Sequence, residues 1–144
     1  MQLTTASEVV RFSGELEDTA ANFYEKLAEK YPECKETFLS FLKENRKNRV
    51  MVQRTYNEVV TDALETGFSF EGLNVDEYIF EGAVAEDASL SNVVQRALEI
   101  EEKLQKFYTT AAKMSKSLLA DIPRVFERIG KRGEERKEKL KLLL

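Results

Sequence analysis

The sequence predicts an all-α protein, a four-helix bundle made of two helical hairpins that a long crossover joins. Apolar residues recur at alternating steps of three and four along most of the chain, which is the spacing of one helix face. Glycine and proline, which interrupt helices, number only six and two among 144 residues. This length suits one domain, residues 1–144, with its own hydrophobic core.

The first helix is expected over residues 5–31. It starts at a capping box, in which the hydroxyl of Thr5 and the carboxylate of Glu8 each accept a hydrogen bond from the other residue's backbone N–H. It ends before Pro32, because the residue that precedes a proline disfavours helical geometry.

The second helix is expected over residues 37–65, and the crossover over residues 66–88. The crossover has three glycines and several acids, lacks helical spacing, and is too long for a tight hairpin. Its aromatic side chains either cover the end of the bundle, form a contact between subunits, or pack on their own bundle. They are Phe68, Phe70, Tyr78 and Phe80.

The third and fourth helices are expected over residues 89–114 and 122–143. Pro123 falls in the first turn of the fourth helix, where the N–H that proline lacks has no intrahelical partner in any case. The connection between these two helices is short, as is the one between the first two. Each pair should therefore form an antiparallel hairpin.

Several classes of protein are excluded by composition. No apolar run approaches the ~20 residues that cross a bilayer, and the first residues lack the pattern of a signal peptide, so we expect a cytoplasmic protein with no membrane partner. Cys34 is the single cysteine, and we expect it to be a buried or unreactive thiol. The net charge of −4 argues against phosphate binding as the main activity. The chain has no histidine, the commonest metal ligand and general base.

The apolar stripe of each helix is interrupted in its middle. The first and third helices place Glu17 and Glu101 there, each seven residues before the tyrosine of a Phe-Tyr pair. Since burying polar groups without partners is costly, the four interruptions should meet in one layer. The matching spacing also indicates an internal duplication, with the first hairpin repeated as the second. The other residues of this set are Tyr24, Tyr108, Asn45, Asn48, Gly133 and Arg136.

A simpler interpretation remains open for the two acids and the two tyrosines. Glu17 and Glu101 could lie at the edge of the stripe and reach water, as a single glutamate in a helix usually does. Tyr24 and Tyr108 are expected to be core aromatic residues with satisfied hydroxyl groups rather than redox groups.

The chain resembles the ferritin-like superfamily, especially the short rubrerythrin-related proteins that lack a rubredoxin domain. The resemblance extends over nearly the whole chain, through ELEDTAANFYEKLAEKYPE, TFLSFLKENRKNR, EIEEKLQKFYTTAAK and VFERIGKRGEER. It implies a ferritin-like bundle in which Glu17 and Glu101 would be two of the ligands of a di-iron site, beside Tyr24 and Tyr108. It also implies a Glu-x-x-His pair from each of the other two helices.

This sequence departs from that pattern at the two Glu-x-x-His pairs. Asn45 and Asn48 stand at the first pair, and Gly133 and Arg136 at the second. Asparagine is a poor iron ligand, glycine has no side chain, and arginine stays cationic. We therefore expect no metal. Instead, Arg136 should neutralise the two buried glutamates in a closed polar network with Asn45 and Asn48, whereas Glu44 should point off the stripe.

Three functions are compatible with the sequence. The first is a non-catalytic binding or interaction module that forms a homo-oligomer, in the simplest case a dimer. The second is an oxidoreductase or peroxide-handling protein that binds iron or manganese through Glu17 and Glu101. The third is a weak nucleic-acid binder that uses the basic faces of the second and fourth helices. We expect interleaved glutamates to pair with those cations, and a nucleic-acid partner is disfavoured. The cations are Lys43, Arg46, Lys47, Arg49, Arg54, Arg124, Arg128, Lys131, Arg132, Lys137, Lys139 and Lys141.

Overall fold

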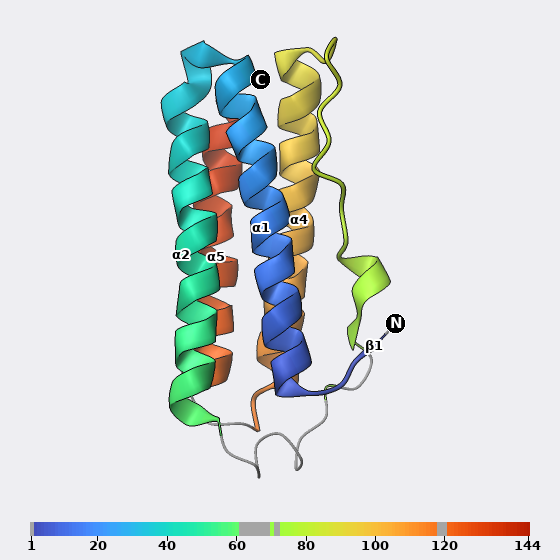
Figure 1. Ribbon diagram of the computed structural model, residues 1–144, viewed down its shortest axis with the longest axis vertical. Helices are drawn as coiled ribbons and strands as arrows, with labels where there is room; N and C mark the ends of the chain where they lie inside the picture. Colours follow the sequence, from blue (N-terminus) through green and yellow to red (C-terminus); the bar gives the residue numbers. More distant parts are fainter. Residues whose placement is uncertain (1, 61–69, 71–72, 118–120) are drawn as a thin grey trace.

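The computed structural model describes residues 2–60, 70, 73–117 and 121–144, and it confirms the all-α bundle of two hairpins joined by a crossover. Long helices run side by side (Figure 1). The most extensive contacts are between α1 and α2 and between α4 and α5, which are the two hairpins. No helix in the described ranges is long and apolar enough to cross a membrane. The long helices are α1 (Ala6–Lys30), α2 (Lys35–Val59), α4 (Leu90–Met114) and α5 (Asp121–Lys141).

The start of α1 has the predicted capping box. The Thr5 hydroxyl accepts a hydrogen bond from the Glu8 backbone N–H at 3.1 Å, and the Glu8 carboxylate accepts one from the Thr5 backbone N–H at 3.0 Å. The helix ends at Lys30, two residues before Pro32. A 3₁₀ turn, Pro32–Cys34, then leads directly into α2, so α2 begins two residues earlier than predicted. Cys34 in this turn is buried.

The predicted end of α2 is wrong. The helix stops at Val59, and Val60 has extended geometry with φ −67° and ψ 134°. Two consecutive β-branched residues weaken the helix at this point, because their side chains lose rotamer freedom against the preceding turn. Residues 61–65, over which the helix was expected to continue, lie outside the described residues. At the other end of the chain, α5 stops at Lys141 rather than at residue 143.

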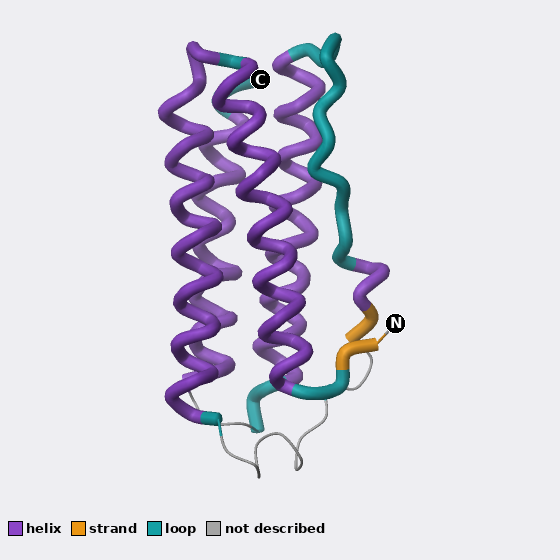
Figure 2. Tube along the Cα trace, viewed as in Figure 1, coloured by secondary structure: helices purple, strands orange, loops and turns teal. Residues whose placement is uncertain are grey.

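The crossover contains short regular elements that were not predicted. Leu73–Asn74 (β2) pairs antiparallel with Gln2–Leu3 (β1), and a 3₁₀ turn, Val75–Glu77, follows (Figure 2). Of its aromatic residues, Phe70 and Tyr78 are buried in the core of their own bundle, and Phe80 packs against that core. Phe68 lies outside the described residues.

Residues 79–88, here called the strap, run in an extended conformation along the side of the bundle between α1 and α4 (Figure 1). Side chains of both helices donate hydrogen bonds to its carbonyl groups. Lys30 and Tyr31 bond to Glu86 and Ala88 at 2.6 Å each, and Lys103 of α4 bonds to Ile79 at 2.8 Å. The strap therefore covers the seam between α1 and α4, which contact each other less than α2 and α5 do.

The aromatic core repeats from one hairpin to the other, as expected for a duplicated structure. The rings of Tyr24 and Phe38 lie 6.1 Å apart between centroids, and those of Tyr108 and Phe126 also lie 6.1 Å apart. The Phe-Tyr neighbours on α1 and α4 meet edge-to-face in both hairpins, at 5.4 and 5.2 Å. Equivalent residues thus occupy equivalent places in the two halves.

Candidate functional site

Five polar side chains form a layer in the middle of the bundle, each with an exposed fraction of 2% or less. Glu17 and Glu101 come from the first helix of each hairpin, and the other three come from the second helices. The interpretation that the glutamates reach water at the stripe edge is therefore wrong. The members of this polar layer are Glu17, Asn45, Asn48, Glu101 and Arg136.

Glu17 is held within the first hairpin by two amides. The Asn45 Nδ2 atom donates to Glu17 Oε2 at 3.3 Å, and the Asn48 Nδ2 atom donates to Oε1 and Oε2 at 3.3 and 3.4 Å. The two asparagines lie three residues apart, so they occupy the same face of α2. Glu17 thus receives neutral amide hydrogen bonds and no direct hydrogen bond from a cation in the described part of the chain.

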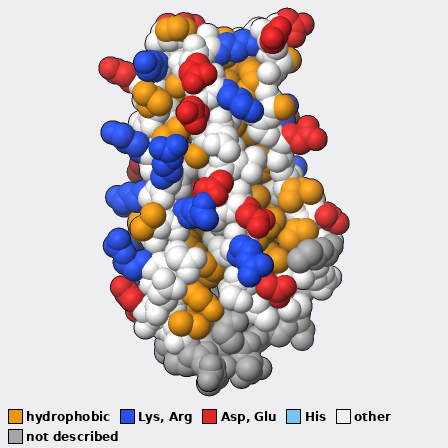
Figure 3. All heavy atoms as spheres, in the orientation of Figure 1, with side chains coloured by type: hydrophobic (Ala, Val, Ile, Leu, Met, Phe, Trp, Pro, Cys, Tyr) orange, Lys and Arg blue, Asp and Glu red, His pale blue; other side chains and the backbone are white. Residues whose placement is uncertain are grey.

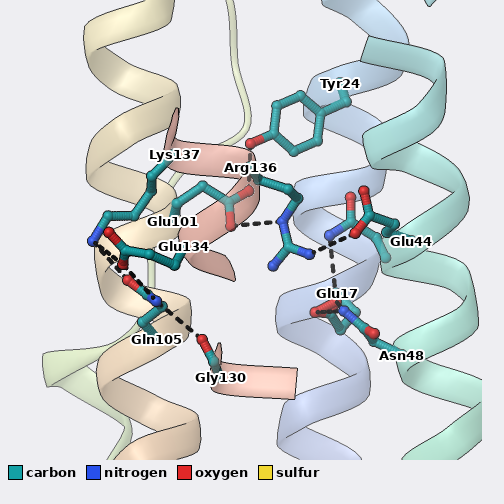
Figure 4. Close-up of polar contacts among 11 residues, drawn as sticks. Glu17, Tyr24, Glu44, Asn48, Glu101, Gln105, Gly130, Glu134, Arg136 and Lys137 are labelled. Carbon is teal, nitrogen blue, oxygen red and sulfur yellow. Dashed lines mark hydrogen bonds and ion pairs between the residues drawn. The ribbon is translucent and has the colours of Figure 1, made fainter. Parts of the chain in front are cut away.

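Glu101 is held within the second hairpin by the guanidinium group of Arg136 (Figure 4). The Arg136 Nε atom donates to Glu101 Oε1 at 2.9 Å. The other carboxylate oxygen, Oε2, accepts a hydrogen bond from the Tyr24 hydroxyl at 2.5 Å. Glu101 therefore accepts one hydrogen bond from a charged donor and one from a neutral donor, the usual condition for burying a carboxyl group.

The network differs from the predicted one at Arg136. Its Nη1 atom donates to Glu44 Oε1 at 3.2 Å, so Glu44 points toward the layer rather than off the stripe. Glu17 and Arg136 share no hydrogen bond. The side chain of Arg136 is long enough to cross from α5 to α2, and Glu44 meets it from the half-buried rim. Two contacts, Tyr24 with Glu101 and Arg136 with Glu44, therefore connect the hairpins.

Two buried polar atoms in and beside the layer have no partner among the described residues: Asn45 Oδ1 and the Tyr108 hydroxyl. The Tyr24 hydroxyl is satisfied by Glu101, as expected. The Tyr108 hydroxyl lies close to Glu17, which helps to raise the pKa of Tyr108, but it makes no hydrogen bond of normal geometry. The two tyrosines are equivalent in the repeat, but Tyr24 meets an acid that a cation already neutralises. The two hairpins thus resemble each other in the positions of their aromatic rings and differ in the hydrogen bonds of their tyrosines.

Burial and charge set the protonation of the layer. Burial, reinforced by the charge of Glu101 and partly opposed by Arg136 and the two amides, raises the pKa of Glu17 to about 7. Burial also raises the pKa of Tyr24 and of Tyr108 well above the ordinary value, so both phenols stay neutral. Burial works against the charge of Arg136, but the surrounding carboxylates outweigh it and raise the pKa of the guanidinium. Arg136 is therefore a permanent internal cation.

The residues present do not fit a di-iron centre. Arg136 occupies the layer with a fixed positive charge, and the asparagines present N–H donors to Glu17 where a metal would need lone pairs. A side chain at position 133 would also lack room, because a Cβ on Gly133 would lie 2.8 Å from Gln105 Cγ. In the described part of the chain, no three Asp, Glu or Cys side chains are grouped so that they could hold a metal.

A second polar cluster, which was not predicted, lies beside the layer (Figure 4). Lys137 Nζ donates to Glu102 Oε1 at 2.5 Å and to Gln105 Oε1 at 2.6 Å, and Gln105 Nε2 donates to the Gly130 carbonyl at 3.0 Å. This cluster connects α4 to α5 near the surface. Its one signal was the position of Gln105, four residues after Glu101 and hence on a neighbouring part of the same helix face.

No protein-family model, no curated protein and no solved structure matches this chain.

Proposed function

We propose that this protein is a non-catalytic, ferritin-like bundle related to the rubrerythrins, in which a polar Glu/Asn/Arg layer stands where relatives would hold two iron ions. It would serve as a binding or interaction module rather than as a redox enzyme. The ferritin-like part of the proposal is supported by the order of the hairpins, the crossover between them and the repeated aromatic pairs. A dimeric state remains a prediction.

The proposal that the bundle is non-catalytic rests on the position of Arg136. The guanidinium of Arg136 lies between Glu101 and Glu44, at the depth where both glutamates of the repeat enter the core. A cation supplied by the chain pairs directly with Glu101 and acts on Glu17 through its charge, and these are the acids that would otherwise attract a metal ion. Placing a second cation there would cost electrostatic repulsion at close range in a poorly solvated interior.

The test is metal analysis of protein purified without a metal-affinity tag. We expect much less than one equivalent of iron or manganese per chain, before and after incubation with Fe²⁺ or Mn²⁺, and no peroxidase activity. Stoichiometric metal in the wild-type protein, or turnover of peroxide after loading with Fe²⁺, would overturn the proposal in favour of an oxidoreductase that uses Glu17 and Glu101.

A variant with restored ligands serves as the positive control for the assay. It carries the four family-type substitutions together with Gln105→Ala, which removes the side chain that fills the space over Gly133. If the bundle is ferritin-like, this variant should bind iron while the wild-type protein does not. A folded variant that stays metal-free would count against the ferritin-like assignment. The four substitutions are Asn45→Glu, Asn48→His, Gly133→Glu and Arg136→His.

A further inference from the structure

The outer surfaces of α2 and α5 carry a group of eight exposed cations, here called the α2–α5 face. On α2, Lys43, Lys47 and Arg54 recur at steps that keep them on one side of the helix. On α5, Arg124, Arg128 and Arg132 recur at steps of four. Figure 3 shows Lys and Arg side chains along the edge of the molecule that α2 forms. The eight are Lys43, Arg46, Lys47, Arg54, Arg124, Arg128, Arg132 and Lys139.

These cations have no ion-pair partner among the described residues. The glutamates interleaved with them on α5 pair instead with lysines that are outside this group of eight. Glu127 pairs with Lys131 and Glu138 with Lys141, each at 3.6 Å. Glu134 pairs with Lys137, which faces α4. The expected helical ion pairs are thus confirmed for Lys131, Lys137 and Lys141, and the eight cations of the α2–α5 face lie outside them.

The register of the two helices brings the cations together in two rows. The Arg136–Glu44 ion pair sets α5 beside α2, and the helices run in opposite directions (Figure 1). Residues at similar distances from this pair on the two helices therefore lie at similar levels. Lys47 and Arg132 are three and four residues from it, and Arg54 and Arg128 are ten and eight residues from it. The exposed acids on α5 between Arg132 and Lys139 are Glu134, Glu135 and Glu138. Glu134 and Glu138 pair with Lys137 and Lys141. At 1.5 Å per residue, the row on α5 from residue 124 to 139 is ~22 Å long.

The charge of the chain is segregated, although its total is −4. Helices α2 and α5 together contain fourteen Lys or Arg and eight Asp or Glu, whereas residues 60–89 contain eight Asp or Glu and no Lys or Arg. Within the described part of the crossover, residues 73–88 contain five Asp or Glu and no Lys or Arg. A polyanion would therefore be attracted to the α2–α5 face and repelled from the side that the strap covers. Such a field orients a charged partner during its approach.

We propose that the α2–α5 face binds the phosphate backbone of a nucleic-acid duplex. Five of the eight cations are arginines, whose planar forks suit phosphate oxygens. The row on α5 is long enough to meet several successive phosphates of a duplex, which carries one negative charge per ~1.7 Å of helix axis. Neither helix exposes an aromatic side chain on which unpaired bases could stack, so the contact is sequence-independent and made to phosphate. The face also lacks the continuous apolar strip with which a helix enters a membrane.

The test is binding of a fluorescein-labelled 25-base-pair DNA duplex, followed by fluorescence anisotropy at several salt concentrations. For the wild-type protein, we expect the logarithm of the affinity to fall linearly with the logarithm of salt concentration. Arg128→Glu/Arg132→Glu should weaken binding by about tenfold or more at low salt and flatten the salt dependence. Arg11→Glu/Lys113→Glu changes the net charge equally at exposed positions off the face, and it should weaken binding by less than about threefold.

Three results would overturn the proposal. They are no salt-dependent binding by the wild-type protein, equal losses in the two variants, and tighter binding to polyglutamate or to vesicles containing phosphatidylserine than to the duplex. The expected loss of duplex binding should not come from misfolding, because replacing cations within a row of like charges removes repulsion. The thermal midpoint of Arg128→Glu/Arg132→Glu should stay equal to that of the wild type or rise, and the duplex assay is interpreted at a temperature where both variants are folded.

Discussion

At the scale of single residues, the most consequential side chain is Arg136. It is 2% exposed, yet its charge is balanced by Glu101 inside the core and by Glu44 at the rim. Buried ion pairs of this kind add little to stability compared with an apolar replacement of both partners. Losing one partner is costly, because the other charge is then stranded.

Arg136→Leu should lower the free energy of unfolding by about 3–5 kcal/mol, because Glu101 would be left ionised and unpaired in the core. Urea denaturation followed by circular dichroism measures this loss. Adding Glu101→Gln to the same chain should recover part of it, since the uncompensated charge disappears. An Arg136→Leu protein as stable as the wild type would mean that the ion pair in the polar layer has no energetic role.

The pKa of Glu17 gives stability a pH dependence with a definite sign. The folded-state pKa, about 7, is above the ordinary value of 4.5, so the folded protein binds more protons between these values than the unfolded chain does. Stability is then greatest below pH 4.5, as far as this group is concerned, and falls as pH rises through 7. From pH 5 to pH 8 the loss attributable to Glu17 should be roughly 2–3 kcal/mol.

Glu17→Gln isolates that contribution, because glutamine has the same shape and does not titrate. The difference in unfolding free energy between this variant and the wild type should grow in favour of the variant from pH 5 to pH 8. A difference that is constant with pH would show that Glu17 titrates normally.

At the scale of elements, the strap depends on a close approach at Gly82. A Cβ at this position would lie 3.3 Å from the Thr19 carbonyl oxygen and 3.7 Å from Phe23 Cβ, both of which belong to α1. The helix backbone cannot move aside easily. The glycine is thus what lets the extended segment lie against the helix.

Gly82→Val should lift the strap and lower the free energy of unfolding by about 1–3 kcal/mol, because the added side chain collides with the α1 backbone. Ala83→Val is the matched control, since Ala83 is the exposed neighbour in the same strap. Hydrogen exchange should show faster exchange of residues 79–88 in the first variant only. Equal exchange in both variants would rule out the close approach.

Sequence patterns predicted those parts of the fold that local chemistry controls. The capping box at Thr5 and the start of α4 after Ser89 depend on side chains within a few residues, and the polar layer depends on helix periodicity. The pairing of β1 with β2 was missed, because two-residue strands show no alternation and their partners lie 70 residues apart. Glu44 was missed because the reach of Arg136 across the seam depends on how the hairpins pack.

At the scale of the whole molecule, the two hairpins are connected by polar contacts at one depth. Tyr24 reaches from the first hairpin to Glu101 of the second, and Arg136 reaches back to Glu44. Around these contacts the core is continuous and apolar. The hairpins should therefore separate and unfold together.

Tyr24→Phe combined with Glu44→Gln should lower the free energy of unfolding by about 2–4 kcal/mol. The first substitution removes a hydrogen bond to Glu101, and the second removes the negative charge that faces Arg136. Unfolding should remain a single transition, with coincident curves from helix content and from tyrosine near-ultraviolet circular dichroism. Tyr31→Phe, which removes a contact to the strap within one side of the bundle, is the control and should cost about 1 kcal/mol. Separate transitions in the double variant would show that each hairpin folds alone.

Because the positive charge at the centre of the bundle belongs to Arg136, it is delivered with the polypeptide at synthesis. Folding should then proceed at the same rate in iron-starved and iron-replete cells, and a chelator such as EDTA should leave the melting temperature unchanged. Under the proposed non-catalytic role, mismetallation and oxidative loss of a centre are hazards that the core would not face.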